Sequence, residues 1–310
     1  MTRFAITHTT RYDYARPVSR CLNLAYMLPR NSERQTCFQN RMIVTPTTSV
    51  ATERLDYFGN RVYEFAIEEP HDWLEITAKS IVDVNSNESM PGLDFGNTCR
   101  QVLEQLYNSA NVATLFAREF TLPSPLITIR EDLRLSLANY AGPLFRHDRT
   151  FLSAVRELTQ KIYNDFQYDP HFSDVSTPLA DVFAHKRGVC QDFAHLAIGC
   201  LRTLGFPARY VSGYLETQAP PGQVKLVGVD ASHAWFAVYS PNEGWYEFDP
   251  TNDILAGHQH VVTAWGRDYS DVPPLKGVIF GGGQQHRLNV SVHVERIGDT
   301  RNGAINMVNR

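Results

Sequence analysis

The sequence predicts an α+β protein in two parts, in which an all-β, sandwich-like region precedes a mixed region of helices and antiparallel strands. Two patterns support this prediction. Short runs of alternating apolar and polar residues fill residues 1–95, whereas helical periodicity marks the middle of the chain and strand-like runs return from Ala208 to Trp265. With 310 residues, 43% of them hydrophobic, the chain is long enough to build two domains.

The first 95 residues show the period of two that is typical of half-buried strands. Alternation is clearest in four runs, at residues 4–12, 22–28, 63–67 and 74–78. Turn-forming residues such as Phe58-Gly59-Asn60 separate the runs. We therefore expect an N-terminal β-sandwich-like domain over residues 1–95.

The middle of the chain has a helical character. Residues 96–149 mix short helical runs with prolines at positions 123, 125 and 143, which predicts a helical connector. Apolar residues recur at helical spacing from Phe151 to Phe166, and Thr177-Pro178 is suited to the first turn of a further helix.

Near the C-terminus, apolar and polar residues alternate strictly from Leu288 to Val294. This strand follows the sheet of the second part, so we expect it to find its partner in the N-terminal sandwich. Residues 284–310 are thus assigned to a returning strand followed by a loose tail from about residue 300.

Cys190 has the surroundings of a reactive thiol. The apolar stripe that begins at Phe193 predicts a helix ending near Leu204, because Gly205 and Pro207 follow. Cys190 then lies in the first turn, where unpaired N–H groups and the helix dipole favour a thiolate. Cys200 falls on the apolar stripe of the same helix, so we interpret it as a core residue.

A base and an orienting carboxylate are available downstream. His233 directly precedes an apolar strand, and the next strand ends at Asp249 after a turn-rich segment over residues 240–244. In an antiparallel hairpin, the beginning of one strand lies beside the end of the next, so these two side chains should meet. A cysteine, a histidine and a carboxylate in these positions are the groups that nucleophilic acyl transfer requires.

These residues resemble the transglutaminase-like superfamily of cysteine hydrolases, and more specifically bacterial transglutaminase-like cysteine proteases with an additional N-terminal domain. The matching segments are residues 187–195, 207–214, the surroundings of His233, residues 248–252 and residues 266–272. The resemblance is specific from about residue 162 to 283 and weaker toward both termini. It implies a papain-like cysteine proteinase fold for a catalytic domain over residues 150–283. It also implies Cys190 as nucleophile, His233 as base and acid, and Asp249 as the orienting carboxylate.

The remainder of the site is less specified. The backbone N–H of Cys190 is a natural oxyanion donor, and the resemblance implies an upstream aromatic donor, for which Tyr168 is the candidate. An aromatic ring packed under a loop is an equally good interpretation of Tyr168. Gln191 and Asp192 either line the site or cap the helix, with capping favoured for Asp192.

Several aromatic residues and histidines leave more than one role open. Trp235, Trp245 and Tyr214 shape either the substrate cleft or the core. His185 and His195 lie near Cys190 in the sequence, so either could be proposed as the base. His195, five residues along the helix, would point aside, and His185 stays as a weaker alternative to His233. His258 and His260 would share one face of a strand and could hold a metal ion, but no convincing carboxylate accompanies them. We expect neither a metal nor a cofactor.

The reaction expected from these residues is hydrolysis of a peptide, isopeptide or related amide, in a peptide or protein substrate, through a thioester on Cys190. Transfer of the acyl group to an amine is the alternative within the same chemistry. A non-catalytic binding module of the same fold is the alternative from another class.

The composition indicates which classes of binding partner to expect. The net charge is −4 and the 29 basic residues are scattered, which argues against a nucleic-acid or anionic membrane partner. Five cysteines, at positions 21, 37, 99, 190 and 200, show no zinc-type spacing and do not form an even set for disulfides. The sequence begins without an apolar signal region, so a cytoplasmic location is expected, while the oligomeric state stays open.

Overall fold

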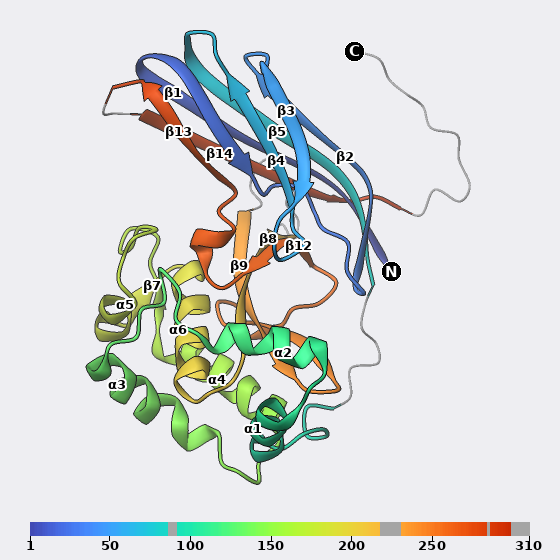
Figure 1. The fold of residues 1–310 in the computed structure, drawn as a ribbon, viewed down its shortest axis with the longest axis vertical. Helices are drawn as coiled ribbons and strands as arrows, with labels where there is room; N and C mark the ends of the chain where they lie inside the picture. Colours follow the sequence, from blue (N-terminus) through green and yellow to red (C-terminus); the bar gives the residue numbers. More distant parts are fainter. Residues whose placement is uncertain (86–91, 218–230, 284–285, 299–310) are drawn as a thin grey trace, which may run out of the picture.

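The computed structural model describes residues 1–85, 92–217, 231–283 and 286–298. It consists of a β-domain and a second, mixed domain in which helices surround a smaller sheet (Figure 1). The α+β class predicted from the sequence is confirmed, including the all-β region at the N-terminus.

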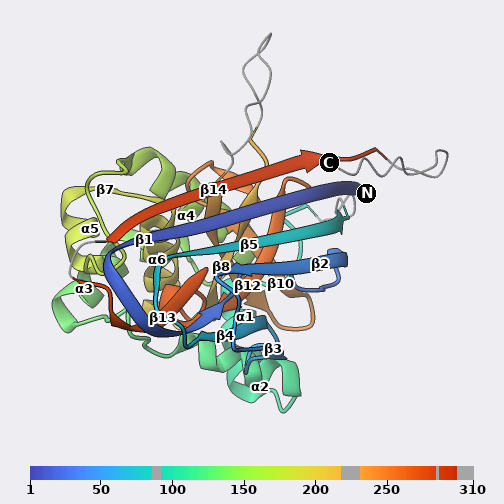
Figure 2. The same cartoon turned by 90° about the horizontal axis from the view of Figure 1, so that it is seen from above.

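The β-domain is organised around one long strand, β1 (Thr2–Ala25). The first half of β1 pairs with β5 (His71–Val84) and β14 (His286–Arg296), and β2 (Gln35–Thr45) pairs with the far edge of β5. Figure 2 shows these four strands side by side. All of these pairs are antiparallel.

The second half of β1 belongs to another group of strands. From Val18 onward β1 pairs with β13 (Leu275–Gly281), and from Cys21 also with β4 (Arg61–Ile67), which in turn pairs with β3 (Val50–Leu55). Side chains from both halves bury one core between them; it includes Val18, Phe65, Ile67, Leu74 and Ile76. The continuous sheet therefore folds over on itself into two layers, which is the sandwich-like packing predicted for this region.

The last described strand of the chain returns to the β-domain. β14 pairs with β1 over eleven positions, from Phe4↔Arg296 to Tyr14↔His286. The same sheet also takes in β13, which the sequence-based division assigned to residues 150–283. Its sequence, LKGVIFG, lacks regular alternation, so its partner was not evident. The predicted tail from residue 300 and residues 284–285 lie outside the described residues.

The helices build the second domain. They are α1 (Cys99–Asn108), α2 (Val112–Arg118), α3 (Glu131–Ala141), α4 (Phe151–Asp165), α5 (Leu179–His185) and α6 (Cys190–Thr203), with short 3-10 turns at Glu119–Thr121, Gly142–Leu144 and Tyr269–Asp271. The predicted connector, residues 96–149, supplies α1 to α3. These helices bury Val102, Leu106 and Leu137 in the same core as α4 and α6, so they form part of the second domain rather than a separate linker.

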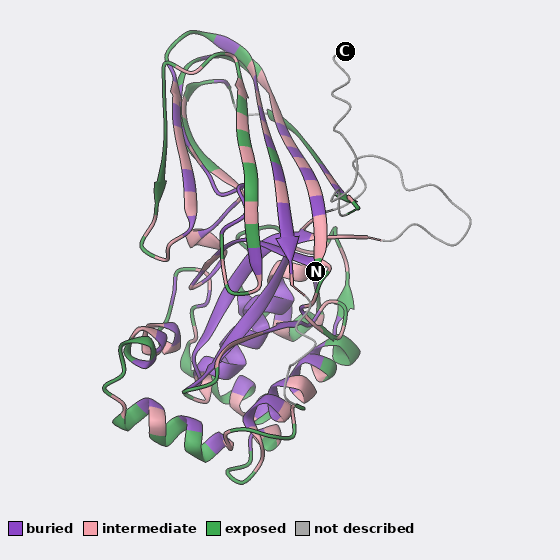
Figure 3. Cartoon of the chain, turned by 90° about the vertical axis from the view of Figure 1, so that its right-hand side faces the viewer, coloured by how far each residue is buried: buried purple, intermediate pink, exposed green. Residues whose placement is uncertain are grey.

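The sheet of the second domain carries the candidate site. Its strands are β8 (Ala208–Leu215), β9 (Ala231–Ser240), β10 (Gly244–Asp249), β11 (Ile254–Leu255) and β12 (His260–Gly266), in the order β11-β10-β9-β8-β12. A two-stranded parallel pair, β6 (Gln167–Tyr168) with β7 (Arg187–Gly188), leads into α6. Helix α6 packs against β8 and β9, and Figure 3 shows buried residues concentrated in this sheet and the helices behind it.

Two side-chain amides of the β-domain cover the edge strand β12. Gln35 donates to the carbonyl of Val262 (2.7 Å) and accepts from its N–H (2.8 Å). Asn60 makes the same pair of bonds with Trp265, at 2.8 and 3.0 Å. Each amide takes the place of a neighbouring strand, so the edge of the second sheet is satisfied by the first domain.

Candidate active site

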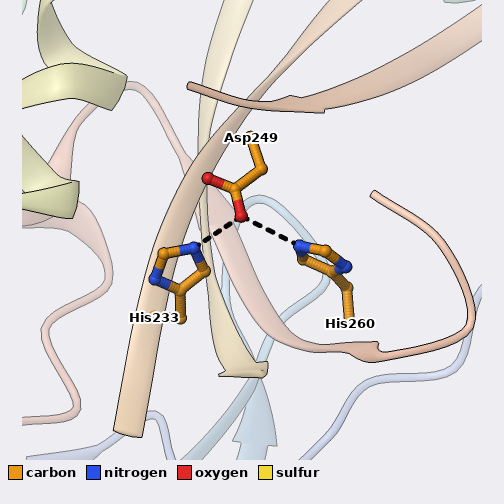
Figure 4. A group of neighbouring side chains, drawn as sticks. All are labelled: His233, Asp249 and His260. Atoms are coloured by element: carbon orange, nitrogen blue, oxygen red, sulfur yellow. Dashed lines mark hydrogen bonds and ion pairs between the residues drawn. The ribbon is translucent and has the colours of Figure 1, made fainter. Parts of the chain in front are cut away.

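The hairpin of β9 and β10 brings the predicted base and carboxylate together. The strands pair from Gly244↔Ser240 to Phe248↔Phe236, which leaves His233 and Asp249 near the same end of the hairpin. The Nε2 atom of His233 lies 2.8 Å from Oδ2 of Asp249, and the two side chains are 8% and 0% exposed (Figure 4). The predicted contact between these residues is confirmed.

Cys190 is the first residue of α6 and is partly exposed. Its side chain interacts with His233, which lies between the thiol and Asp249. Because Nε2 of His233 faces Asp249, the other ring nitrogen, Nδ1, is left for the thiol. Three groups predicted from separate segments of the sequence thus form a connected series.

The electrostatics of this series favour an imidazolium ion. Burial lowers the pKa of His233, but hydrogen bonds and charge interactions with Asp249 and Cys190 outweigh it and raise the pKa to about 10. Burial acts to raise the pKa of Asp249, whereas its bonds to His233 and His260 hold it well below the usual range. The arrangement favours a protonated His233 beside the Asp249 carboxylate and the Cys190 thiol.

The other thiols lack this environment. Burial raises the pKa of the thiols of Cys21, Cys37, Cys99 and Cys200. Cys200 is fully buried in the core, as its place on the apolar stripe predicted. The five thiols of the chain therefore divide into one beside a histidine and four whose ionisation is disfavoured.

The carboxylate has two further side-chain partners that the sequence did not identify. His260 Nε2 lies 3.2 Å from Oδ2 of Asp249, and Asn252 donates to the same oxygen at 2.7 Å (Figure 4 shows the histidines). Backbone N–H groups of Thr251 and Asn252 donate to Oδ1. The sequence paired His260 with His258 as a possible metal site, but His258 is exposed and His260 is buried.

His233, Asp249 and His260 are close enough to be considered as metal ligands, since their donor atoms lie within 4.8 Å of one another. The hydrogen bonds favour another interpretation. The N–H of Gly257 donates to Nδ1 of His260 (3.3 Å), so the proton of a neutral ring is on Nε2, which then donates to Asp249. An imidazole N–H and the amide N–H of Asn252 cannot ligate a cation, so this donor set fits a hydrogen-bonded carboxylate.

Asp192 caps the helix that begins at Cys190, as favoured from the sequence. Its Oδ2 accepts from the N–H of Val189 (2.8 Å) and from the hydroxyl of Ser173 (2.5 Å). Gln191 is only partly buried, and its amide lies 3.4 Å from the carbonyl of Val175. Asp192 thus fixes the helix start without facing solvent.

Tyr214 and Trp235, which the sequence left open between the substrate cleft and the core, both lie in the core. Tyr214 is 2% exposed, and its hydroxyl donates to the carbonyl of Met27 (2.8 Å) and contacts His8 at 2.9 Å. Trp235 is fully buried, its ring stacks beside His233, and its indole N–H donates to Glu247 at 2.9 Å. An alternating strand pattern does not tell which face meets solvent, so these burials were not predictable.

Two tyrosines lie near the thiol. Tyr168 is 53% exposed on β6, and burial, followed by the charge of Cys190, raises its pKa. The same two influences raise the pKa of Tyr210, a buried residue of β8 that the sequence did not single out. Both rings are therefore within electrostatic reach of the candidate nucleophile.

The alternative bases are engaged elsewhere. His185 is exposed, and its Nδ1 lies 2.9 Å from the carbonyl of Asp181. His195 accepts from the N–H of Tyr269 at 3.1 Å, and burial lowers its pKa to about 4. Both have partners of their own, whereas His233 joins the thiol to a carboxylate.

Among the residues that the structure describes, no helix has the length and hydropathy needed to cross a membrane.

Comparisons with known proteins agree with this architecture. The family described as the bacterial transglutaminase-like N-terminal region matches residues 4–83, and the transglutaminase-like superfamily matches residues 138–250. An uncharacterised protein of Mycobacterium tuberculosis is 39% identical over 296 residues, which cover 94% of this chain and 92% of the relative.

Two further likenesses are more distant. A protein-glutamine gamma-glutamyltransferase of Pseudomonas aeruginosa is 28% identical over 178 residues, or 52% of this chain and 25% of that enzyme. A solved structure from Cytophaga hutchinsonii, provisionally described as a cysteine protease, has a TM-score of 0.70 at 22% identity and covers 96% of this chain and 91% of its own. With both of its regions matched, this chain belongs to the transglutaminase-like superfamily and carries the N-terminal region of the bacterial members.

Proposed function

We propose that the protein is a cysteine-dependent amidase that hydrolyses a peptide, isopeptide or related amide through a thioester on Cys190. The observation that carries the proposal is the position of His233 between a partly exposed thiol at a helix start and a buried, ionised Asp249. These are the surroundings in which a thiol becomes a nucleophile near neutral pH.

In the first half of the reaction, the Cys190 thiolate attacks the carbonyl carbon of the amide and forms a C–S bond. The developing oxyanion accepts hydrogen bonds, for which the backbone N–H of Cys190 at the start of α6 is one donor and the Tyr168 hydroxyl a second candidate. The His233 imidazolium then gives its proton to the leaving nitrogen as the C–N bond breaks. A neutral amine departs and a thioester is left.

In the second half, neutral His233 takes a proton from water, and the resulting hydroxide attacks the thioester carbonyl. The C–S bond breaks, the free acid leaves, and the thiolate–imidazolium pair is restored. Asp249 keeps its charge throughout; its role is to orient His233 and stabilise the imidazolium.

Transfer of the acyl group to an amine is the second candidate within this chemistry. The similarity to a protein-glutamine gamma-glutamyltransferase supports it, because that name denotes transfer of an acyl group rather than hydrolysis. A non-catalytic binding module is a third candidate, and the presence of the thiol, imidazole and carboxylate together counts against it.

The experiment is a screen of the purified protein on a peptide and isopeptide library, with products followed by mass spectrometry. Cys190→Ala is the matched control, because it removes only the sulfur atom. We expect cleavage by the wild type alone, with mostly free acid when a millimolar primary amine is present. An amide adduct that dominates at low amine concentration would make the protein a transamidase, and equal products from both proteins would refute catalysis by Cys190.

A further inference from the structure

We propose that His260 is a positioning residue for the base, acting as a second histidine that holds Asp249 against His233. This inference rests on the proposed function, because it assigns His233 the role of base. It assigns a function to a residue that lies on neither the helix of Cys190 nor the hairpin of His233 and Asp249.

The protonation state of His260 follows from its partners. Nδ1 accepts the Gly257 N–H, so Nε2 carries the proton and donates to Asp249 Oδ2 at 3.2 Å. Burial lowers the pKa of His260, which keeps the ring neutral beside the imidazolium of His233. A neutral donor stabilises the carboxylate without adding a second positive charge.

The bond of His260 fixes the direction of the carboxylate. Oδ2 of Asp249 receives both histidines and the amide of Asn252, while Oδ1 receives two backbone N–H groups. Without His260, Oδ2 loses its donor on the side opposite His233. The carboxyl group then gains freedom to turn, and the imidazole of His233 loses its fixed partner.

The surroundings of His260 hold the ring in place. Its ring makes a T-shaped contact with Trp235, with ring centres 5.0 Å apart, and the indole N–H of Trp235 donates to Glu247. Glu247 is paired with Arg34 of the β-domain at 3.5 Å and interacts with Arg209. Asp249, His233 and Glu247 are the ionisable groups that act on His260, and it makes its direct bond to the first of them.

The test compares His260→Leu, which removes the donor at similar volume, with His260→Gln, whose amide retains one. His8→Leu is the matched control, because His8 is as buried as His260 (1% exposed each) but bonds to Tyr214 and Thr10 instead of Asp249. The rate of Cys190 alkylation by iodoacetamide is measured from pH 5 to 9 by peptide mass spectrometry, alongside the melting temperature. The wild type gives the highest alkylation rate expected in this series, and His233→Ala gives the lowest.

We expect His260→Leu to slow alkylation near neutral pH by about tenfold or more, the range set by loss of a bond to a charged group. The midpoint of the pH profile of alkylation should also move upward relative to the wild type, because the thiol loses a firmly held imidazole partner. His260→Gln should restore most of the rate, and His8→Leu should lower the melting temperature without moving the profile.

A His260→Leu profile equal to that of the wild type, with only a lower melting temperature, would overturn the positioning role and leave the proposed function intact. A His260→Gln variant in which Cys190 is alkylated as slowly as in His260→Leu would also overturn the positioning role. If the wild type itself alkylates Cys190 no faster than His233→Ala does, the base assignment fails, and the role of His260 fails with it.

Discussion

At the scale of single residues, the carboxylate of Asp249 is the group that orients and charges the candidate site. Asp249 is fully buried and accepts from two histidines, an asparagine and two backbone N–H groups. An unpaired buried carboxylate would be costly, and five donors make the ionised form the stable one. The imidazolium of His233 depends on that charge.

Cys190 and Asp249 should differ in sensitivity to substitution. Cys190→Ala removes the covalent step and should abolish turnover while the protein stays folded. Asp249→Asn should leave measurable activity, because only orientation and imidazolium stabilisation are lost. The measurement is amidase rate with circular dichroism as the folding control; an Asp249→Asn enzyme as fast as the wild type would remove Asp249 from the mechanism.

The raised pKa of His233 predicts a pH-dependent contribution to stability. The pKa rises from an ordinary 6.5 to about 10 on folding, so the folded state binds the proton more tightly. The stabilisation is then complete below pH 6.5 and is lost as the pH rises to about 10. The melting-temperature difference between wild type and His233→Gln should shrink over that range, and a difference that grows with pH would contradict the ion pair.

At the scale of elements, helix α6 and the β9–β10 hairpin bring the reactive groups together. The helix begins at Cys190 because Asp192 accepts the Val189 N–H and Ser173 steadies the same carboxylate. The hairpin register then sets His233 beside Asp249. Contacts between residues that are near one another in the sequence account for the start of the helix and for the register of the hairpin.

Removal of the helix cap should therefore be costly. Asp192→Ala loses two hydrogen bonds to a buried carboxylate and should reduce the free energy of unfolding by about 2 kcal/mol. Asp192→Asn, which keeps an acceptor, should lose less. Urea denaturation compares the three proteins, and an unchanged midpoint for Asp192→Ala would show that the helix start is held by other contacts.

Local patterns account for what the sequence predicted. The apolar stripe of α6, the turn-rich segment before β10 and the alternation in β14 each lie within a few residues of the feature that they indicate. His260 was not assigned to Asp249 because their contact depends on the long-range path of the chain. Ala256 packs over the face of the sheet that holds Trp235 before the chain enters β12, and no local signal predicts that crossing.

The sequence left Tyr214 between cleft and core, and treated α1 to α3 as a connector, for a similar reason. Tyr214 meets the β-domain, and a sequence pattern does not reveal which surface a second domain covers. The helices of residues 96–149 are short and broken by prolines, so their shared core with α4 and α6 was not apparent from periodicity.

At the scale of the whole molecule, the β-domain supports the sheet that carries the candidate site. Gln35 and Asn60 satisfy the edge of β12, and Arg34 pairs with Glu247 behind Trp235. A small core joins the domains, made of Phe4, Ile6, Val82, Val84, Tyr214, Val261, Val292 and Val294. Strand β14 supplies the last two of these residues.

Truncation after Gly283 should consequently damage both domains. It removes β14, exposes one edge of β1 and takes Val292 and Val294 out of the shared core. We expect aggregated or poorly folded protein, measured by size-exclusion chromatography and thermal melting. A monodisperse truncated protein with an unchanged melting temperature would show that β14 contributes little.

The central claim, that Cys190 is a nucleophile activated by His233 and Asp249, is tested most directly by competition among the five thiols. The folded protein is treated briefly with substoichiometric iodoacetamide at neutral pH, and alkylation of each cysteine is quantified by peptide mass spectrometry. The account predicts that Cys190 is modified far ahead of Cys21, Cys37, Cys99 and Cys200, and that His233→Ala removes this preference. The account would be contradicted if Cys190 were alkylated only as fast as the exposure of its sulfur accounts for, and if the rate were the same in His233→Ala.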